Sequence, residues 1–288
     1  MRWRGRRQSR NVEDRRGQRF IRSRKGAGSG VMILLILAGV FFGEDVQRVL
    51  SFFVGGDTSS GYQPGYEQSA QGSQTKIGQN DEAAQFVSVI LAETEDTWNA
   101  IFARANRTYQ PPILVLYEDQ VQSACGVNSA ASGPFYCPGD YKVYIDLSFL
   151  NELRRMGAPG DFAFAYVIAH EVGHHIQNLE GTADKVRAMQ ARSTKANANA
   201  LSVRMELQAD CYAGIWINHT ETRSAILETG DIQEGFAAAA AVGDDRIMQQ
   251  AGRAPRRENF THGSSEERMQ WFQRGMQSGS LQACQTFN

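Results

Sequence analysis

Apolar residues recur at helical spacing along most of the chain after residue 81. Between Phe86 and Phe102 they repeat every three or four positions, which predicts one helix that the following proline pair ends. The apolar run 162–169 predicts a second helix, and its composition indicates that this helix is buried. The same periodicity predicts further helices at 148–155, 201–218 and 266–275, with an alanine-rich one after Asp231.

Strand signals are confined to a shorter stretch. Residues 113–117 form an apolar run of strand length, and residues 135–146 predict two strands joined by a Pro-Gly-Asp turn. We expect the strand Tyr141–Asp146 to lie at an edge of the sheet, beside the buried helix. The pattern therefore predicts an α+β fold: a mostly helical domain with a small β-sheet.

The first 54 residues differ from the rest in charge and hydropathy. Residues 1–25 hold eleven Lys and Arg against two acidic residues, and a charge-free apolar run, Gly30–Gly43, follows them. We interpret 1–25 as a basic cytoplasmic tail and 26–54 as a transmembrane anchor with its juxtamembrane segment, oriented by the positive-inside rule. A cleaved signal peptide is the alternative, but no A-x-A-like cleavage site follows the run.

These segments predict a single-pass protein of the inner (plasma) membrane, with its N-terminus in the cytoplasm. Residues 55–80 are rich in Gly, Ser and Gln, which predicts a flexible linker. Residues 81–288 then form the functional domain on the periplasmic or extracellular side, and the membrane is an expected partner. Beyond residue 25 the chain carries a net charge of −10 and no basic stripe, which argues against nucleic acid as a substrate.

One motif in the buried helix has the spacing of a metal site. In His170-Glu-x-x-His174 the two histidines are four residues apart and share a helical face, so both imidazoles can bind one ion. Neutral imidazole suits Zn²⁺, and a catalytic zinc needs three protein ligands and one open position. Glu171 is the candidate general base. A chance match on a solvated helix is the alternative, but this helix is too apolar for that, and we predict one zinc ion per chain.

The third zinc ligand has several candidates. The metzincin spacing fails, because Gln177 and Glu180 stand where that pattern has Gly and His. Glu206 and Asp210 are four residues apart on another predicted helix, amid apolar neighbours, where paired carboxylates are costly unless they are bound. We therefore predict Glu206 as the ligand and Asp210 as a hydrogen-bond acceptor for a ligand imidazole. The alternatives are pairing of these acids with Arg204 or Arg223, and ligation by His219, His262 or Glu234 instead.

A loop histidine is the candidate second catalytic donor. His262 lies in a Thr-His-Gly-Ser-Ser loop before a predicted helix, where it can reach a cleft and stabilise a developing oxyanion. Tyr144 and Tyr212 compete for that role. His262 could instead only fasten its loop through a backbone hydrogen bond.

Four cysteines can form two disulfides in an oxidising compartment. Cys125 and Cys137 bracket a loop rich in Gly, Ser and Ala, while Cys211 and Cys284 remain. We therefore expect the pairs 125–137 and 211–284. Four buried thiols are the alternative.

Several longer motifs point to a known family: H-E-V-G-H-H-I-Q, R-M-E-L-Q-A-D-C-Y-A-G, T-H-G-S-S-E-E-R-M-Q-W-F and, near the N-terminus, N-V-E-D-R-R-G. On these motifs the chain resembles the bacterial neutral zinc metallopeptidases over nearly its whole length. The resemblance implies a zincin-like domain with a gluzincin ligand set of two histidines and a downstream glutamate. It places that set on His170, His174 and Glu206, with Glu171 catalytic.

The predicted function is a membrane-anchored, zinc-dependent peptidase that hydrolyses peptide bonds on the extracytoplasmic side. A peptide or protein substrate can add as a strand to an exposed sheet edge. The alternative is a zinc-stabilised envelope binding or regulatory protein without turnover. The intact Glu171 favours the peptidase, because a structural zinc needs no base and is usually closed by four protein ligands.

Overall fold

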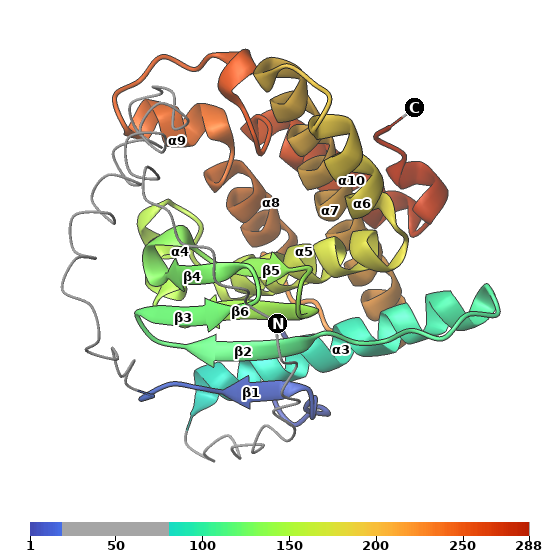
Figure 1. Ribbon diagram of the computed structural model, residues 1–288. Coiled ribbons are helices and arrows are strands. Elements are labelled where there is room, and N and C mark those ends of the chain that lie inside the picture. Colours follow the sequence, from blue (N-terminus) through green and yellow to red (C-terminus); the bar gives the residue numbers. More distant parts are fainter. Residues whose placement is uncertain (19–80, 288) are drawn as a thin grey trace, which may run out of the picture. The chain divides into compact units, whose positions relative to one another are not determined.

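The structure is a computed structural model that describes residues 1–18 and 81–287 (Figure 1). Its fold class is α+β, as the sequence predicts. The strands are β1 (Val12–Asp14), β2 (Ile113–Tyr117), β3 (Gln120–Ser123), β4 (Gly126–Ser129), β5 (Phe135–Cys137) and β6 (Lys142–Asp146). The α-helices are α3 (Glu82–Arg104), α4 (Phe149–Arg155), α5 (Asp161–Leu179), α6 (Thr182–Gln190), α7 (Lys195–Ser224), α8 (Asp231–Ala241), α9 (Asp244–Gln250) and α10 (Ser265–Ser278).

The larger sheet has the strand order β1-β2-β6-β5. β1 pairs with β2, and β2 with β6, in parallel, whereas β5 runs antiparallel to β6. The prediction that residues 141–146 form an edge strand is therefore wrong, because β6 lies inside the sheet. The strand at that edge, next to α5, is β5.

Both faces of the sheet are covered, so β2 is buried almost throughout. Successive side chains of a strand point to opposite faces. Leu114 and Leu116 belong to the main core with the helices, while Val115 and Tyr117 pack with Val121 of the β3–β4 hairpin in a second, smaller core. This explains why β2 appears in the sequence as a continuous apolar run instead of an alternating one.

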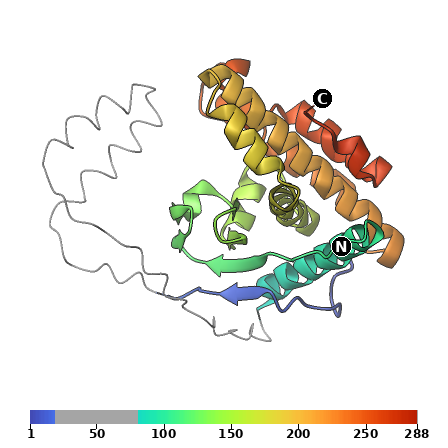
Figure 2. The same cartoon turned by 45° about the vertical axis from the view of Figure 1, so that its right-hand side comes forward.

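Helix α5 is the centre of the molecule. It contacts α3 and the sheet on one side and α7 and α8 on the other, and Figure 2 views it nearly along its axis. Its residues from Phe162 to Gly173 are all buried. At Gly173 the backbone of α7 comes very close, since a Cβ there would lie 3.0 Å from the carbonyl oxygen of Ala209. The glycine inside the H-E-x-x-H motif thus lets α7 cross against the middle of α5.

Both predicted disulfides are confirmed. Cys125 is bonded to Cys137, which ties the edge strand β5 to the start of the β4 hairpin strand. Cys211 is bonded to Cys284, which fixes the segment after α10 to α7. Each disulfide therefore fastens an element at the surface of the fold to a more deeply buried one.

The first eighteen residues belong to the same compact unit as residues 81–287. Met1 and Trp3 are buried in the main core, and the ring of Trp3 lies 5.3 Å from that of Phe86 on α3. β1 extends the sheet beyond β2. Nearby arginines form ion pairs with acids of α3: Arg6 with Glu93 at 3.1 Å, and Arg7 with Glu95 at 3.0 Å and Asp96 at 2.7 Å.

The predicted single-pass topology is therefore wrong. One membrane crossing between residues 18 and 81 would place β1 and β2 on opposite sides, yet Val12 is paired with Leu114 in one sheet. Residues 1–18 therefore do not form a cytoplasmic tail that a membrane separates from the rest of the domain.

The predicted anchor, 26–54, and linker, 55–80, lie outside the described residues. None of the helices in the part of the chain that the structure describes is long and apolar enough to cross a membrane.

Candidate metal centre

Three predicted ligands from two helices meet at one point. His170 and His174 of α5 and Glu206 of α7 bring their ligand atoms within 4.8 Å of one another. His170 Nε2 lies 3.1 Å from one carboxylate oxygen of Glu206, and His174 Nε2 lies 3.4 Å from the other. Ligand atoms held at about 2.1 Å by a tetrahedral zinc lie about 3.4 Å apart. The donor set and its spacing therefore fit zinc.

The second nitrogen of each imidazole is held by another side chain. His170 Nδ1 donates to Asp210 at 2.8 Å, and His174 Nδ1 donates to the side-chain oxygen of Gln177 at 2.8 Å. Gln177 is itself fixed by donating to the carbonyl of Met205 at 2.7 Å. Both rings are thus oriented with Nε2 toward Glu206, which is the arrangement that metal-binding histidines usually have.

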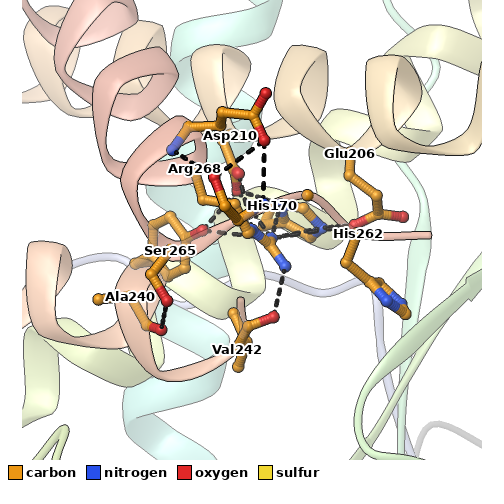
Figure 3. A network of polar contacts seen from close by, with 12 residues as sticks. His170, Glu206, Asp210, Ala240, Val242, His262, Ser265 and Arg268 are labelled. Carbon is orange, nitrogen blue, oxygen red and sulfur yellow. Dashed lines mark hydrogen bonds and ion pairs between the residues drawn. The ribbon is translucent and has the colours of Figure 1, made fainter. Parts of the chain in front are cut away.

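A buried arginine on α10 joins this network, and Figure 3 shows it beside Asp210, His170 and Val242. Arg268 is 3% exposed, and its Nε and Nη2 lie 2.8 and 2.9 Å from the two oxygens of Asp210. Its Nη1 donates to the carbonyl of Val242 at 3.3 Å. Burial raises the pKa of Asp210, but the charge of Arg268 and that of His170 outweigh burial and hold that pKa below its usual value. Arg268 therefore keeps Asp210 charged and able to accept from His170.

The charges around His170 favour a cation. Burial opposes a positive charge on this imidazole, but Asp210 and Glu206 outweigh burial and raise its pKa to about 10. The same carboxylates attract a metal ion, and a metal that binds Nε2 takes the place of the proton there. Electrostatics and geometry thus agree on a cation site between α5 and α7.

His170, His174, Glu206 and Arg268 line a cavity of about 600 Å³. Glu171 also lines it, is 7% exposed, and forms no hydrogen bond or ion pair with any of the described residues. A carboxylate that is buried beside a cation site without a protein partner is available to bind and move a proton.

His262 reaches the same cavity from the loop before α10. Its Nδ1 lies 3.2 Å from Asp244, and its backbone N–H donates to the other oxygen of that acid at 2.6 Å. The hydrogen bond with Asp244 raises the pKa of His262 against the effect of burial. Asp244 thus orients the ring and favours its protonated form, while Nε2 forms no bond with the described residues.

Much of the remaining cavity wall is apolar. Some lining residues come from β5 and the segment before it. Val167 also lines the cavity, one helical turn before Glu171 on α5. Others come from α4 and from the region of α8 and α9: Phe149, Met156, Val242 and Ile247. The cavity therefore combines a small polar floor with an apolar surface large enough for side chains of a substrate.

The alternative ligands and donors lie elsewhere, His262 excepted. His219 Nε2 donates to the carbonyl of Gly279 at 2.9 Å, and Glu234 accepts from the backbone N–H of Phe162 at 3.0 Å. The cavity lining does not include Tyr144 or Tyr212. Arg223 pairs with Glu93 of α3, so the arginine that binds Asp210 is Arg268 and neither of the two predicted from the sequence.

Sequence reasoning missed Arg268, Gln177 and Asp244. A signal for Arg268 exists, because it shares one face of its helix with Phe272 and Gly275 at positions i, i+4 and i+7. An arginine on a buried face needs an acid partner, and Asp210 was already a candidate acid. Gln177 is three residues after His174 and therefore within reach of it on the helix surface. Nothing in the sequence marks Asp244 as the partner of His262.

Comparisons with known proteins show the family of the chain. A model of the family described as "Putative neutral zinc metallopeptidase" matches residues 1–287. The uncharacterized protein YpfJ of Escherichia coli is 46% identical over 297 residues, which cover 100% of this chain and 99% of the relative. The uncharacterized protein Rv2575 of Mycobacterium tuberculosis is 39% identical over 243 residues, which cover 81% of this chain and 79% of the relative. No solved structure gives a significant match.

Proposed function

The chain belongs to the neutral zinc metallopeptidase family, and on that premise we propose that it is a zinc-dependent peptidase with one zinc ion per chain. The convergence of His170, His174 and Glu206 beside Glu171 supports this most directly. A closed structural zinc site would have four protein ligands. Among the described residues this cluster has three, which leaves a position for water or substrate.

His170, His174 and Glu206 would hold the zinc, which supplies Lewis acidity toward a water molecule and the scissile carbonyl. Glu171 takes a proton from the attacking water and passes it to the leaving nitrogen. His262, held at Nδ1 by Asp244, donates from Nε2 to the carbonyl oxygen as negative charge develops on it.

The apolar part of the cavity favours a class of peptide. A cleft whose lining includes Val167, Met156 and Ile247 beside Glu171 stabilises a bulky apolar side chain more than a charged one. We infer that the preferred substrates have such a side chain next to the scissile bond. A library of peptides with one varied position on each side of that bond measures this preference.

Zinc analysis and peptide digestion with the full chain test the function, with Glu171→Gln as the matched control. The wild type should contain about one zinc per chain and cleave peptides. Glu171→Gln should keep the zinc and lose roughly 10²- to 10⁴-fold in rate, because it removes the general base and no ligand. Zinc without cleavage in the wild type would favour a binding protein, and equal cleavage by both forms would reject the role of Glu171.

A further inference from the structure

The outer edge of β5 is open at the cavity. β5 is the last strand in the order β1-β2-β6-β5, and no other described strand pairs with its outer side. Phe135 and Tyr136 of β5 both line the cavity that holds Glu171. Open backbone N–H and C=O groups at a sheet edge can bind an extended peptide as an additional strand. The position of β5 relative to α5 then decides where the peptide backbone runs.

One side chain of β5 is bonded to α5. The hydroxyl of Tyr136 lies 3.1 Å from His175 Nδ1 and accepts a hydrogen bond from Asn178 Nδ2 at 3.0 Å. His175 and Asn178 are three residues apart and share a face of the helix. Phe135, the preceding residue of β5, stacks instead on Tyr144 of β6 at 4.8 Å. Tyr136 is therefore the residue through which β5 is attached to the helix of the metal centre.

The direction of these hydrogen bonds is fixed. His175 Nε2 lies 2.7 Å from the carbonyl of Gln110, and a carbonyl only accepts, so the ring proton is on Nε2. Nδ1 then accepts, and the Tyr136 hydroxyl donates to it while it accepts from Asn178. The ring of His175 is also surrounded by those of Tyr109, Tyr136 and Tyr141, at centroid distances of 5.4 to 6.1 Å. His175 therefore has little freedom to move.

The contact between Tyr136 and His175 is next to the metal centre in the chain. His175 directly follows His174, so one peptide bond joins a predicted zinc ligand to the residue that holds the edge strand. We propose that Tyr136 is a positioning residue, which fixes β5 so that an extended peptide on its outer edge presents its carbonyl to Glu171 and the zinc ligands. This inference rests on the proposed function, because it assigns a role in binding the substrate of that same site.

Tyr136→Phe tests the inference, with Tyr144→Phe as its matched control. Each change removes one hydroxyl and keeps the ring. Tyr144 lies on the neighbouring strand and donates to Asp140 at 2.6 Å, but it does not line the cavity. Both are made in the full chain with Glu171→Gln, so that binding is measured without turnover. The probes are a blocked eight-residue peptide with Leu on both sides of its central bond, and the blocked Leu-Leu core alone.

Calorimetry and hydrogen exchange provide two independent measurements. Tyr136→Phe should raise the Kd of the long peptide about ten-fold, the effect of one or two hydrogen bonds. The Kd of the short core should stay within about two-fold of its value for the parent. At a concentration near its Kd for the parent, the long peptide should slow amide exchange in residues 135–137 of the parent and do so much less in Tyr136→Phe. Tyr144→Phe should resemble the parent. Asn178→Ala, which removes the other bond to the same hydroxyl, should repeat the length-dependent loss.

Several outcomes would overturn the role of Tyr136. They are an equal loss for both peptides, no loss for the long peptide, or no protection of residues 135–137 in the parent. Binding of the long peptide with protection of β5, but without hydrolysis when Glu171 is intact, would instead reject the proposed function and support the positioning role of Tyr136.

Discussion

Helix α5 contributes to two clusters of ligand-type side chains, and only one of them resembles a metal site. The acidic cluster, at the N-terminus of the helix, consists of Asp161, Asp231 and Glu234. The histidine cluster, in the second half of the helix, consists of His170, His174 and Glu206. In each cluster the ligand atoms lie within 4.8 Å of one another, so distance alone does not separate them.

The difference lies in which atoms already have a partner. In the acidic cluster, Glu234 accepts from the N–H of Phe162, Asp231 accepts from the N–H of Glu228 at 2.7 Å, and the terminal amine lies 3.2 Å from Asp161. The N–H of Phe162 belongs to the first turn of α5, where a helix offers unpaired N–H groups to acids. In the histidine cluster, acceptor oxygens of Asp210 and Gln177 hold the outer Nδ1 atoms, and the Nε2 atoms face the carboxylate of Glu206. The inward atoms of the histidine cluster lie 3.1 and 3.4 Å from one another, and Nη2 of Arg268 is 3.5 Å from His170 Nε2. A set of ligand-type residues indicates a metal site when its inward atoms face mainly one another.

The largest expected effect separates the clusters by metal content. His174→Ala or Glu206→Ala should remove the zinc, because three protein ligands are the minimum of a catalytic zinc site. Asp231→Asn and Glu234→Gln should each keep about one zinc per chain. Atomic absorption on the purified full-length variants measures this. Full zinc occupancy in Glu206→Ala, or zinc loss in Glu234→Gln, would contradict the conclusion that the histidine cluster, and not the acidic cluster, binds the metal.

The next effect concerns the buried charges behind the histidine cluster. Arg268→Met should destabilise the fold by about 3–5 kcal/mol, because it leaves the buried carboxylate of Asp210 without its cation. Arg257, in the segment before α10, forms an exposed pair with Glu267 of that helix, and Arg257→Met should cost less than about 1 kcal/mol. Denaturant titration compares the two variants. Equal losses of unfolding free energy would show that the buried Arg268–Asp210 pair contributes no more to stability than the exposed pair.

His262→Ala should have a smaller effect, and on turnover instead of stability. We expect turnover to fall by about 10²- to 10³-fold, the contribution of one donor to an oxyanion, while zinc content and fold remain. His219 lies outside the cavity, so His219→Ala should keep full turnover. Unchanged turnover in His262→Ala, or a matching loss of thermal stability, would assign His262 to fastening its loop.

The smallest effect is a pH dependence of stability. The pKa of His262 is raised from 6.5, mainly by Asp244, so its contribution is complete below 6.5 and is lost as the pH rises through the raised value. Burial raises the pKa of Asp244, but His262 outweighs it and lowers that pKa from 3.8, so this contribution is lost only in acid.

The melting temperatures of the wild type and His262→Gln should therefore differ more at about pH 5.5 than at about pH 9. An Asp244→Asn background should remove this difference. A gap that widens at high pH would contradict the pairing.

The sequence predicts α5, β2 and the Cys125–Cys137 disulfide well, because each has a local signal, and this disulfide leaves Cys211 and Cys284 for the second one. The H-E-x-x-H spacing and the apolar run define α5. α3 ends at Arg104, before the proline pair that the sequence predicts to end it. β1 has no such signal: Val12 is its one apolar residue, and its partner Leu114 comes about a hundred residues later. A basic composition then suggested a topology signal, whereas the structure uses these arginines in ion pairs with α3.

The order of strands in the sheet is hidden from the sequence for a related reason. β5 and β6 are both short, and their composition does not say which of them has a second partner. β6 is interior because β2 pairs with it in parallel, from Ile113 with Lys142 to Tyr117 with Asp146. A parallel pair has no tight turn between its strands that would mark it. The same limit applies to Asp244, whose role depends on a loop approaching from elsewhere in the chain.

The pairing of β1 with β2 also has a consequence for how the chain folds. β1 is synthesised before β2, which leaves the ribosome only about a hundred residues later. Trp3 and the neighbouring arginines therefore cannot make their contacts until α3 and β2 have been synthesised. Contacts so distant in sequence form slowly, because closing the intervening chain costs entropy before any contact forms. The larger sheet is therefore completed late, when α3 and β2 are already in place. A fragment that starts at residue 81 would leave the edge of β2 unpaired and would remove Arg7, the ion-pair partner of Glu95 and Asp96, so β1 would have to be supplied as a separate peptide.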